Sequence, residues 1–184
     1  MDVSSLPWPT TRPAHGGVEL REFRTEDVAM VRDLATDPYL PLIGTLPARA
    51  DEAEARNYIH RQRGRLAEGV GFSFVIADAD TDAALGGLGL WLRNHQQGRA
   101  SVGYSVAPRA RGRGAAGDAL LAVTGFAWTF PELFRLEAFI EPDNRASVRT
   151  AEAAGYTCEG VLRSYMELGG TRRDMSVHAR LRGE

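Results

Sequence analysis

The stretch from Val102 to Ala116 constrains the fold of this chain more than any other part of the sequence. It begins with alternating residues of the kind that form strands, and Pro108 ends that strand because proline has no N–H to donate. Gly112 and Gly114 then form a glycine-rich turn, and from Ala116 onward apolar residues recur at helical spacing. Such a turn leaves unpaired N–H groups at the positive end of a helix dipole, which suits phosphate oxygens. The stretch therefore predicts a pyrophosphate-binding site.

Three arginines add positive charge beside this turn: Arg109, Arg111 and Arg113. The whole chain carries a formal net charge of −2, so we expect no general affinity for nucleic acid or for anionic membranes. Anion binding must then be local. All 22 basic residues are arginine, which excludes a lysine nucleophile or a lysine Schiff base. The four histidines are scattered without ligand spacing, and we expect no metal site.

A chain of 184 residues predicts one domain. Residues 1–17 are rich in Pro, Ser, Thr and Gly and predict a flexible arm, although Trp8 could dock on the body or on a partner subunit. Residues 18–184 form the domain itself.

The single Cys158 excludes an internal disulfide, and we expect it to be buried and inert. The chain lacks a long apolar run and a secretory signal, so we expect a cytoplasmic protein.

The apolar periodicity predicts the element order β-α-α-β-β-β-α-β-α-β-β. This order indicates a single α/β (α+β) domain in which helices flank a mixed, largely antiparallel twisted sheet of about seven strands. Three glycines in the strand over residues 84–92 predict a bulge or the close approach of another backbone or a ligand. The apolar, irregular segment over residues 37–50 could line a substrate site or cap the core.

Several of these motifs together resemble the GCN5-related N-acetyltransferase (GNAT) family, in particular its RimJ/RimL-like branch, which includes ribosomal-protein N-terminal acetyltransferases. The most specific motif is Arg111-Gly112-Arg113-Gly114-Ala115-Ala116, which is similar to the acetyl-CoA motif of the family. Supporting motifs stand in the family's order: Val102-Gly103-Tyr104, Glu137-Ala138-Phe139, Asn144-Arg145-Ala146-Ser147-Val148 and Ala153-Ala154-Gly155-Tyr156. The resemblance covers roughly residues 18–182.

The resemblance implies a GNAT-type domain in which the strand before the glycine-rich loop splays from its neighbour and the pantetheine arm of acetyl-CoA lies between them. By the same resemblance, the backbone of Val106 pairs with a pantetheine amide. The N–H groups of Arg111, Gly112, Arg113, Gly114, Ala115 and Ala116 hold the pyrophosphate. Asn144 is similar to the residue that binds the arm from the next helix. Ser147 is similar to the residue near the sulfur, where its hydroxyl could protonate the departing thiolate; the alternative is an ordinary helix serine that bonds its own backbone.

The chain departs from this branch at the general base, which is commonly a glutamate two residues before the family's Gly-Tyr. That position is Ser101 here, and serine cannot serve as the base. Glu141 could replace it through water, unless it is a solvent-facing turn carboxylate. Tyr165 could donate the proton to the thiolate instead of Ser147. We expect Glu137 to be a structural partner of other side chains within the sheet. We expect His95 to be a solvated loop residue.

We therefore expect an acetyl-CoA-dependent N-acetyltransferase that acts on a primary amine. The acceptor is either the α-amine of a protein N-terminus, as in the ribosomal-protein enzymes, or a small-molecule amine. The departure at Ser101 allows an alternative, a non-catalytic CoA- or acyl-CoA-binding sensor or scaffold. A Rossmann domain is excluded because the loop follows an antiparallel meander and lacks the full G-x-G-x-x-G pattern. The expected partners are acetyl-CoA and the amine, with no nucleic acid and no membrane; a homodimer is compatible with the branch.

Overall fold

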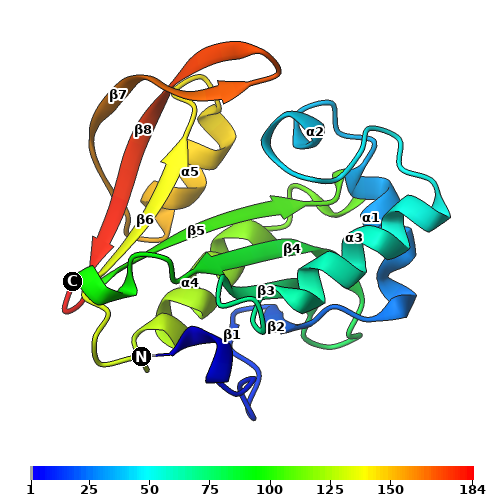
Figure 1. Ribbon diagram of the computed structural model, residues 1–184, viewed down its shortest axis with the longest axis horizontal. Helices are drawn as coiled ribbons and strands as arrows, with labels where there is room; N and C mark the ends of the chain where they lie inside the picture. The colour runs from blue at the N-terminus through cyan, green and yellow to red at the C-terminus, as the bar shows by residue number, and fades with distance from the viewer. Residues whose placement is uncertain (1) are drawn as a thin grey trace.

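The computed structural model describes residues 2–184, in which eight strands form one sheet in the order β1-β2-β3-β4-β5-β6-β8-β7 (Figure 1). The pairs are antiparallel, except that β5 and β6 are parallel. The strands are β1 (Ala14–His15), β2 (Val18–Glu22), β3 (Gly71–Asp78), β4 (Ala84–Trp91), β5 (Arg99–Val106), β6 (Arg135–Ile140), β7 (Thr157–Leu168) and β8 (Thr171–Leu181). The helices are α1 (Val28–Leu34), α2 (Leu40–Ile43), α3 (Glu52–Gly64), α4 (Ala115–Ala127) and α5 (Arg145–Ala153). The predicted fold class is confirmed, and the element order differs by two short additions. The two-residue β1 pairs with β2, and the four-residue α2 lies in the segment that was expected to be irregular.

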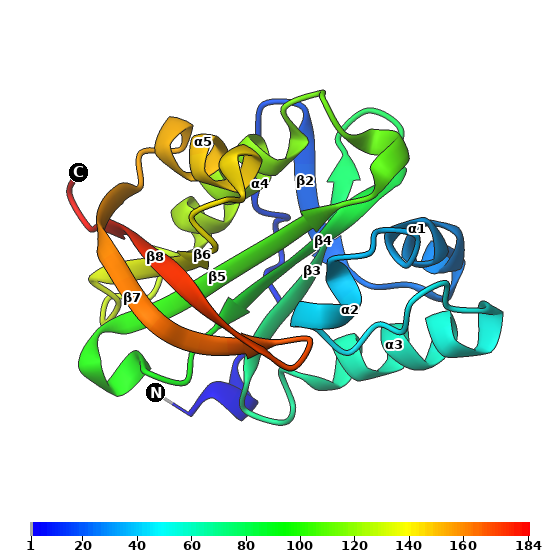
Figure 2. The ribbon, with the colours of Figure 1, turned by 90° about the horizontal axis from the view of Figure 1, so that it is seen from above.

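Strands β1 to β5, the N-terminal half of the sheet, carry helices on both faces (Figure 2). The seven residues of β3 from Gly71 to Ala77 are all buried. Phe72, Phe74 and Ile76 belong to the larger apolar core, which α4 also lines. Val75 and Ala77 belong to the second core, with side chains of α1 and α3. The alternation along one strand therefore supplies two cores, one on each face.

The N-terminal arm packs on this half of the sheet instead of lying loose in solvent. The Trp8 ring meets Phe72 and Phe74 edge-on, with ring centroids 5.6 and 5.3 Å apart, and Val3 is buried. The Leu20 N–H donates to the Pro13 carbonyl at 2.8 Å. The expectation of a flexible arm is wrong here, because one large aromatic side chain anchors a segment whose composition otherwise favours disorder. Docking of Trp8 on the body is the alternative that the structure adopts.

Strands β6, β8 and β7 form the C-terminal half of the sheet, and α5 covers one face of it. Among the described residues, the core that contains α1 and α3 includes no side chain of these three strands. The outermost strand, β7, is exposed along its whole length except Leu168. The prediction that Cys158 is buried is therefore wrong, and its side chain is exposed. Local sequence does not reveal that β7 is an edge strand, where neither face is fully covered.

The glycines of β4 have the predicted cause, a close approach of other groups. A Cβ at Gly86 would lie 2.2 Å from the Ser105 carbonyl oxygen of the neighbouring strand. At Gly89 and at Gly103 of β5, a Cβ would lie 2.7 and 2.9 Å from the indole of Trp91. The Trp91 ring therefore lies flat across two glycines on the sheet surface. No helix of residues 2–184 combines the length and the apolar character that crossing a bilayer requires.

Candidate active site where two strands diverge

The candidate site begins where β5 and β6 separate. These parallel strands pair only at Arg99 with Arg135, Ala100 with Leu136 and Ser101 with Glu137. Beyond Ser101, β5 continues to Val106 and β6 to Ile140 without pairing, and Figure 1 shows the two strands running apart. Two strand edges with free backbone groups therefore face the space between them, and an extended ligand with amide groups could pair there.

The glycine-rich loop after β5 presents a row of free N–H groups. Gly112 and Gly114 have φ values of +79° and +80°, and no atom lies within 4 Å of a Cβ built at either position. The backbone conformation, not crowding, therefore requires glycine, and the space beside the loop is open. Within residues 2–184, the backbone N–H groups of five successive residues donate to no protein acceptor: Gly112, Arg113, Gly114, Ala115 and Ala116. They precede or begin the 13-residue helix α4, so they form a favourable site for a pyrophosphate.

The three arginines of this loop differ in their partners, which the sequence did not predict. The Arg109 N–H donates to Asp33 at 3.2 Å, and the guanidinium lies 3.8 Å from the same carboxylate. Arg111 forms an ion pair with Asp37, and its Nε donates to the Val106 carbonyl at 3.0 Å. Arg113 is exposed and forms no ion pair with any described residue. Arg113 is therefore the arginine whose charge is free for a phosphate.

The first turn of α5 borders the divergence from the other side. The Asn144 side chain caps this helix, since its Oδ1 accepts the Ser147 N–H at 3.2 Å. Tyr104 of β5 reaches across and donates its hydroxyl to the Ser147 carbonyl at 3.1 Å; burial raises the pKa of Tyr104 to about 12. The Ser147 hydroxyl itself makes no hydrogen bond with the described residues. The structure therefore does not have the alternative arrangement, in which the Ser147 hydroxyl bonds the backbone of its own helix.

Glu141 follows β6 directly and lies in a cluster with Tyr39 and Arg173, which we call the Glu141 cluster. Its side chain is 18% exposed, and its Oε1 lies 3.6 Å from Nε of Arg173 on β8. Burial, together with the hydrogen bond and negative charge of Glu141, raises the pKa of Tyr39. Glu141 is thus a half-buried, partnered carboxylate and not a solvent-facing one. The cluster joins the segment before α2, the end of β6 and the β7–β8 hairpin.

Apolar side chains stand beside this cluster. Tyr165 of β7 stacks on Phe139 with ring centroids 5.3 Å apart and remains 47% exposed. Leu42 of α2 packs against the hairpin turn, where a Cβ at Gly169 would lie 2.9 Å from Leu42 Cδ2. Of the two purposes predicted for the irregular segment over residues 37–50, capping the core is the one seen, since Leu46 is buried in the second core. Leu42 stays exposed, and a role in lining a substrate site stays a prediction.

Two weaker candidates lie outside the site. Glu137 is buried in ion pairs with Arg135 at 2.7 Å and Arg99 at 3.5 Å, so the prediction of a structural partner is confirmed. His95 precedes β5, at the opposite end of that strand from Val106, and its Nδ1 lies 2.6 Å from the Leu92 carbonyl. Sequence reasoning missed Asp37 and Tyr39 altogether, because no local pattern marks a residue whose partners lie in distant segments.

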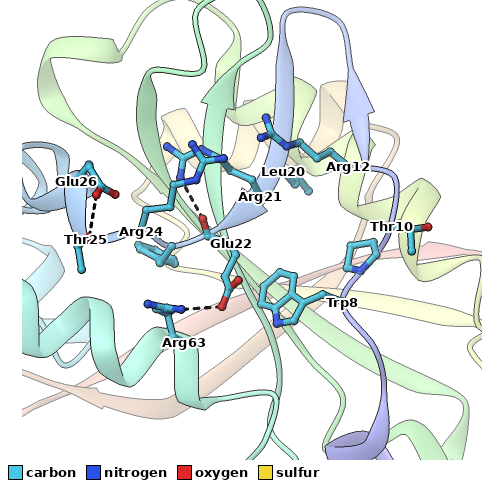
Figure 3. Close-up of a pocket in the computed structure, with 12 residues that line it drawn as sticks. Trp8, Thr10, Arg12, Leu20, Arg21, Glu22, Arg24, Thr25, Glu26 and Arg63 are labelled. Atoms are coloured by element: carbon cyan, nitrogen blue, oxygen red, sulfur yellow. Dashed lines mark hydrogen bonds and ion pairs between the residues drawn. The ribbon is translucent and has the colours of Figure 1, made fainter.

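A pocket of about 480 Å³ lies elsewhere, beside β2, and contains none of the predicted site residues (Figure 3). Trp8 lines it together with four arginines, each of which is already ion-paired within the protein: Arg12, Arg21, Arg24 and Arg63. Figure 3 shows one of these pairs, between Arg63 and Glu22. Because its charges are matched, this pocket lacks the free donors that the glycine-rich loop offers.

Comparison with known families decides what these features belong to, since residues 18–157 match the family model of the acetyltransferase (GNAT) domain. The chain belongs to the GNAT family. A curated relative, uncharacterized N-acetyltransferase p20 of Bacillus licheniformis, is 27% identical over 165 residues, which is 90% of this chain and 93% of the relative. This GNAT protein is an acetyl-CoA-dependent N-acetyltransferase.

Solved structures share the fold of this GNAT chain. Mycobacterium smegmatis RimJ in complex with CoA-disulfide is 28% identical with a TM-score of 0.78, and the match covers 93% of this chain and 84% of that one. The spermidine N-acetyltransferase of Vibrio cholerae in complex with CoA and spermine is 18% identical with a TM-score of 0.72, covering 90% and 95%. The free N–H row and the strand divergence fit acetyl-CoA, which supplies the activated acetyl group when bound.

Proposed function

We propose that this N-acetyltransferase acetylates the α-amine at the N-terminus of a protein or peptide, which binds beside the Glu141 cluster. The observation that carries this proposal is the pairing of the nearby carboxylates. Glu141 pairs with Arg173 and Asp37 with Arg111, while Asp174 accepts the Ser164 N–H at 2.8 Å. A polyamine carries several positive charges and needs several free carboxylates, whereas an N-terminal α-amine carries one charge followed by neutral backbone.

Apolar surface and the likeness to RimJ support the same acceptor. Leu42, Ile43 and Tyr165 are 45%, 44% and 47% exposed, so uncharged side chains would flank a bound peptide. The RimJ structure is 28% identical to this chain, whereas the spermidine enzyme is 18% identical and shares the fold alone.

We assign the cofactor to the residues that the acetyl-CoA motif implies. The free N–H groups of Gly112 to Ala116 hold the pyrophosphate, and the guanidinium of Arg113 adds a charge to it. The Arg111 N–H, which the motif also implies, already donates to the Pro108 carbonyl at 3.4 Å. The carbonyl of Val106 accepts a pantetheine amide through the lone pair that Arg111 leaves free. The amide nitrogen of Asn144 remains available to the arm, because only its oxygen caps α5.

The chemistry needs a proton acceptor for the amine and a proton donor for the leaving sulfur. In this proposal Glu141 accepts the amine proton through a water molecule, and the free hydroxyl of Ser147 donates a proton to the sulfur. Tyr165 is the alternative donor. An α-amine has a pKa of about 8, so on the order of a tenth of it is already neutral at pH 7. A serine at position 101, where the branch commonly has a glutamate, is therefore tolerable for this acceptor.

The test measures acetyl-CoA-dependent thiol release with N-terminal peptides that begin with Ser, Ala or Thr, and with small amines that include spermidine. Gly114→Glu is the blank, because its carboxylate would stand at the free N–H row and repel a pyrophosphate. We expect release with the peptides and a loss of acetyl-CoA binding in the blank. Release with small amines alone would overturn the peptide acceptor. Silence across the panel, with acetyl-CoA still bound, would favour the CoA-binding module instead.

A further inference from the structure

The side chain of Arg111 turns away from the cofactor loop and joins two segments that are distant in the sequence. Its Nε donates to the Val106 carbonyl at 3.0 Å, at the end of β5. Its Nη2 forms an ion pair with Asp37, whose side chain is only 12% exposed. Although burial raises the pKa of Asp37, hydrogen bonds from Arg111 and from the Tyr39 N–H lower it overall, so the carboxylate is ionised at neutral pH. One guanidinium thus bridges the cofactor strand and the segment before α2.

Asp37 carries this link onward to the Glu141 cluster. Its Oδ1 accepts the Tyr39 N–H at 2.7 Å, which fixes the backbone at the start of α2. Polar contacts therefore run from the Val106 carbonyl through Arg111 and Asp37 to the backbone of Tyr39. The side chain of Tyr39 then extends toward Glu141, which its hydroxyl faces. The two ends of this chain of residues are the cofactor site and the acceptor site proposed above.

A second contact between the same loop and α1 does not extend to the acceptor side. Arg109 contacts Asp33 at 3.2 Å through its N–H, while its side chain is 91% exposed. Asp33 lies within α1, before the segment that carries Tyr39. Loss of the Arg109 guanidinium would therefore remove one positive charge from the loop without breaking the chain to Glu141.

We propose that Arg111 is a positioning residue that couples acetyl-CoA binding to the order of the acceptor site. When the Val106 carbonyl and the loop backbone are fixed by the cofactor, the Arg111 side chain holds Asp37, and Asp37 holds Tyr39 beside Glu141. By linkage, an ordered acceptor segment also favours cofactor binding. The inference rests on the cofactor placement proposed above, and the experiment tests that placement separately.

The test follows amide hydrogen exchange of the full-length protein with and without CoA, so no acceptor is needed. In the wild type, we expect CoA to slow exchange at residues 112–116 and, at least about fivefold, at residues 39–44. In Arg111→Met, which keeps the aliphatic stem, CoA should still slow exchange at residues 112–116 but no longer at residues 39–44. Asp37→Asn, which retains an acceptor for the Tyr39 N–H, should weaken the effect at residues 39–44 in the same direction.

Arg109→Met is the matched control, since it removes the same charge from the same loop. It should keep the CoA effect at residues 39–44. Equal protection of residues 39–44 in Arg111→Met and in the wild type would overturn the proposal, as would an equal loss in Arg109→Met. Absence of CoA protection at residues 112–116 in the wild type would instead overturn the cofactor placement.

Discussion

The two halves of the sheet differ in how completely they bury both partners of an ion pair. In the N-terminal half, helices cover both faces, and a charged pair is fully buried: Arg21 and Asp27 meet in two hydrogen bonds of 2.8 and 2.9 Å, with side chains 5% and 4% exposed. In the C-terminal half, one face has no helix, and the carboxylate next to the divergence, Glu141, keeps 18% of its side chain exposed beside a 52% exposed Arg173.

This difference indicates how the fold divides its tasks. A buried ion pair is costly to break, because removing one partner leaves an uncompensated charge in the interior. A half-exposed pair can exchange its partner for water or substrate at little cost. The N-terminal half therefore keeps its buried pair fixed, whereas in the mechanism proposed above the C-terminal half supplies a carboxylate that changes partners during the reaction.

Asp27→Asn should give the largest effect on stability. The substitution leaves Arg21 buried and without its bidentate partner, and we expect the free energy of unfolding to fall by about 3 kcal/mol, the lower end for a broken buried pair. The lower end applies because Arg21 Nε still reaches Asp82 at 3.0 Å. Urea unfolding followed by tryptophan fluorescence measures the change.

The control for this variant is Glu52→Gln on α3, which breaks the exposed pair of Glu52 with Arg56. These side chains are 62% and 53% exposed, so we expect at most about 0.5 kcal/mol. Similar losses in Asp27→Asn and Glu52→Gln would show that burial does not set the worth of an ion pair here, and the comparison of the two halves would lose its basis.

Glu141→Gln should affect activity far more than stability. Without a carboxylate to accept the amine proton, we expect kcat to fall about 100-fold, the lower end for a general base. Because Arg173 is half exposed, the free energy of unfolding should change by less than about 1 kcal/mol. Thiol-release kinetics and urea unfolding give the two quantities.

Glu167→Gln is the matched control in the same half, since Glu167 and its partner Arg172 are each 62% exposed on the hairpin. Its activity should equal that of the wild type. If kcat of Glu141→Gln falls by less than about threefold, a water molecule suffices as the proton acceptor and Glu141 takes no part in the reaction. The nucleophile would then be the fraction of the amine that is already neutral.

The sequence predicted best what short stretches encode. The strand, the turn at Gly112 and Gly114 and helix α4 follow from residue types that admit few other conformations, and the structure has them where expected. The splay and the Ser147 position came from the resemblance, which summarises long-range geometry that no local pattern contains.

The failures concern long-range neighbours. Cys158 has a strand pattern that suits burial, but burial depends on the position of β7 at the sheet edge. Trp8 lies in a stretch of disorder-prone composition, yet its ring packs against two aromatic side chains of β3. The Arg111–Asp37 pair joins residues 74 positions apart, and a sequence with 22 arginines does not reveal which one meets which carboxylate.

The smallest expected effect concerns His178, a buried side chain of the C-terminal half that is neutral at pH 7. His178 is 1% exposed and contacts Ser176 Oγ at 3.1 Å, and burial lowers the pKa of its imidazole. Below pH 6.5 the unfolded chain therefore binds a proton that the folded chain does not, so stability falls as pH decreases. We expect a loss of at most about 1 kcal/mol between pH 6.5 and 5.5, the limit for a folded state that binds no proton in this range, measured by urea unfolding. His178→Asn should abolish this slope, whereas His60→Gln, at an exposed position of α3, should keep it. A slope that survives in His178→Asn would assign the pH dependence to other groups, and the contrast between a buried charged pair and a buried neutral side chain would then not describe how the two halves respond to acid.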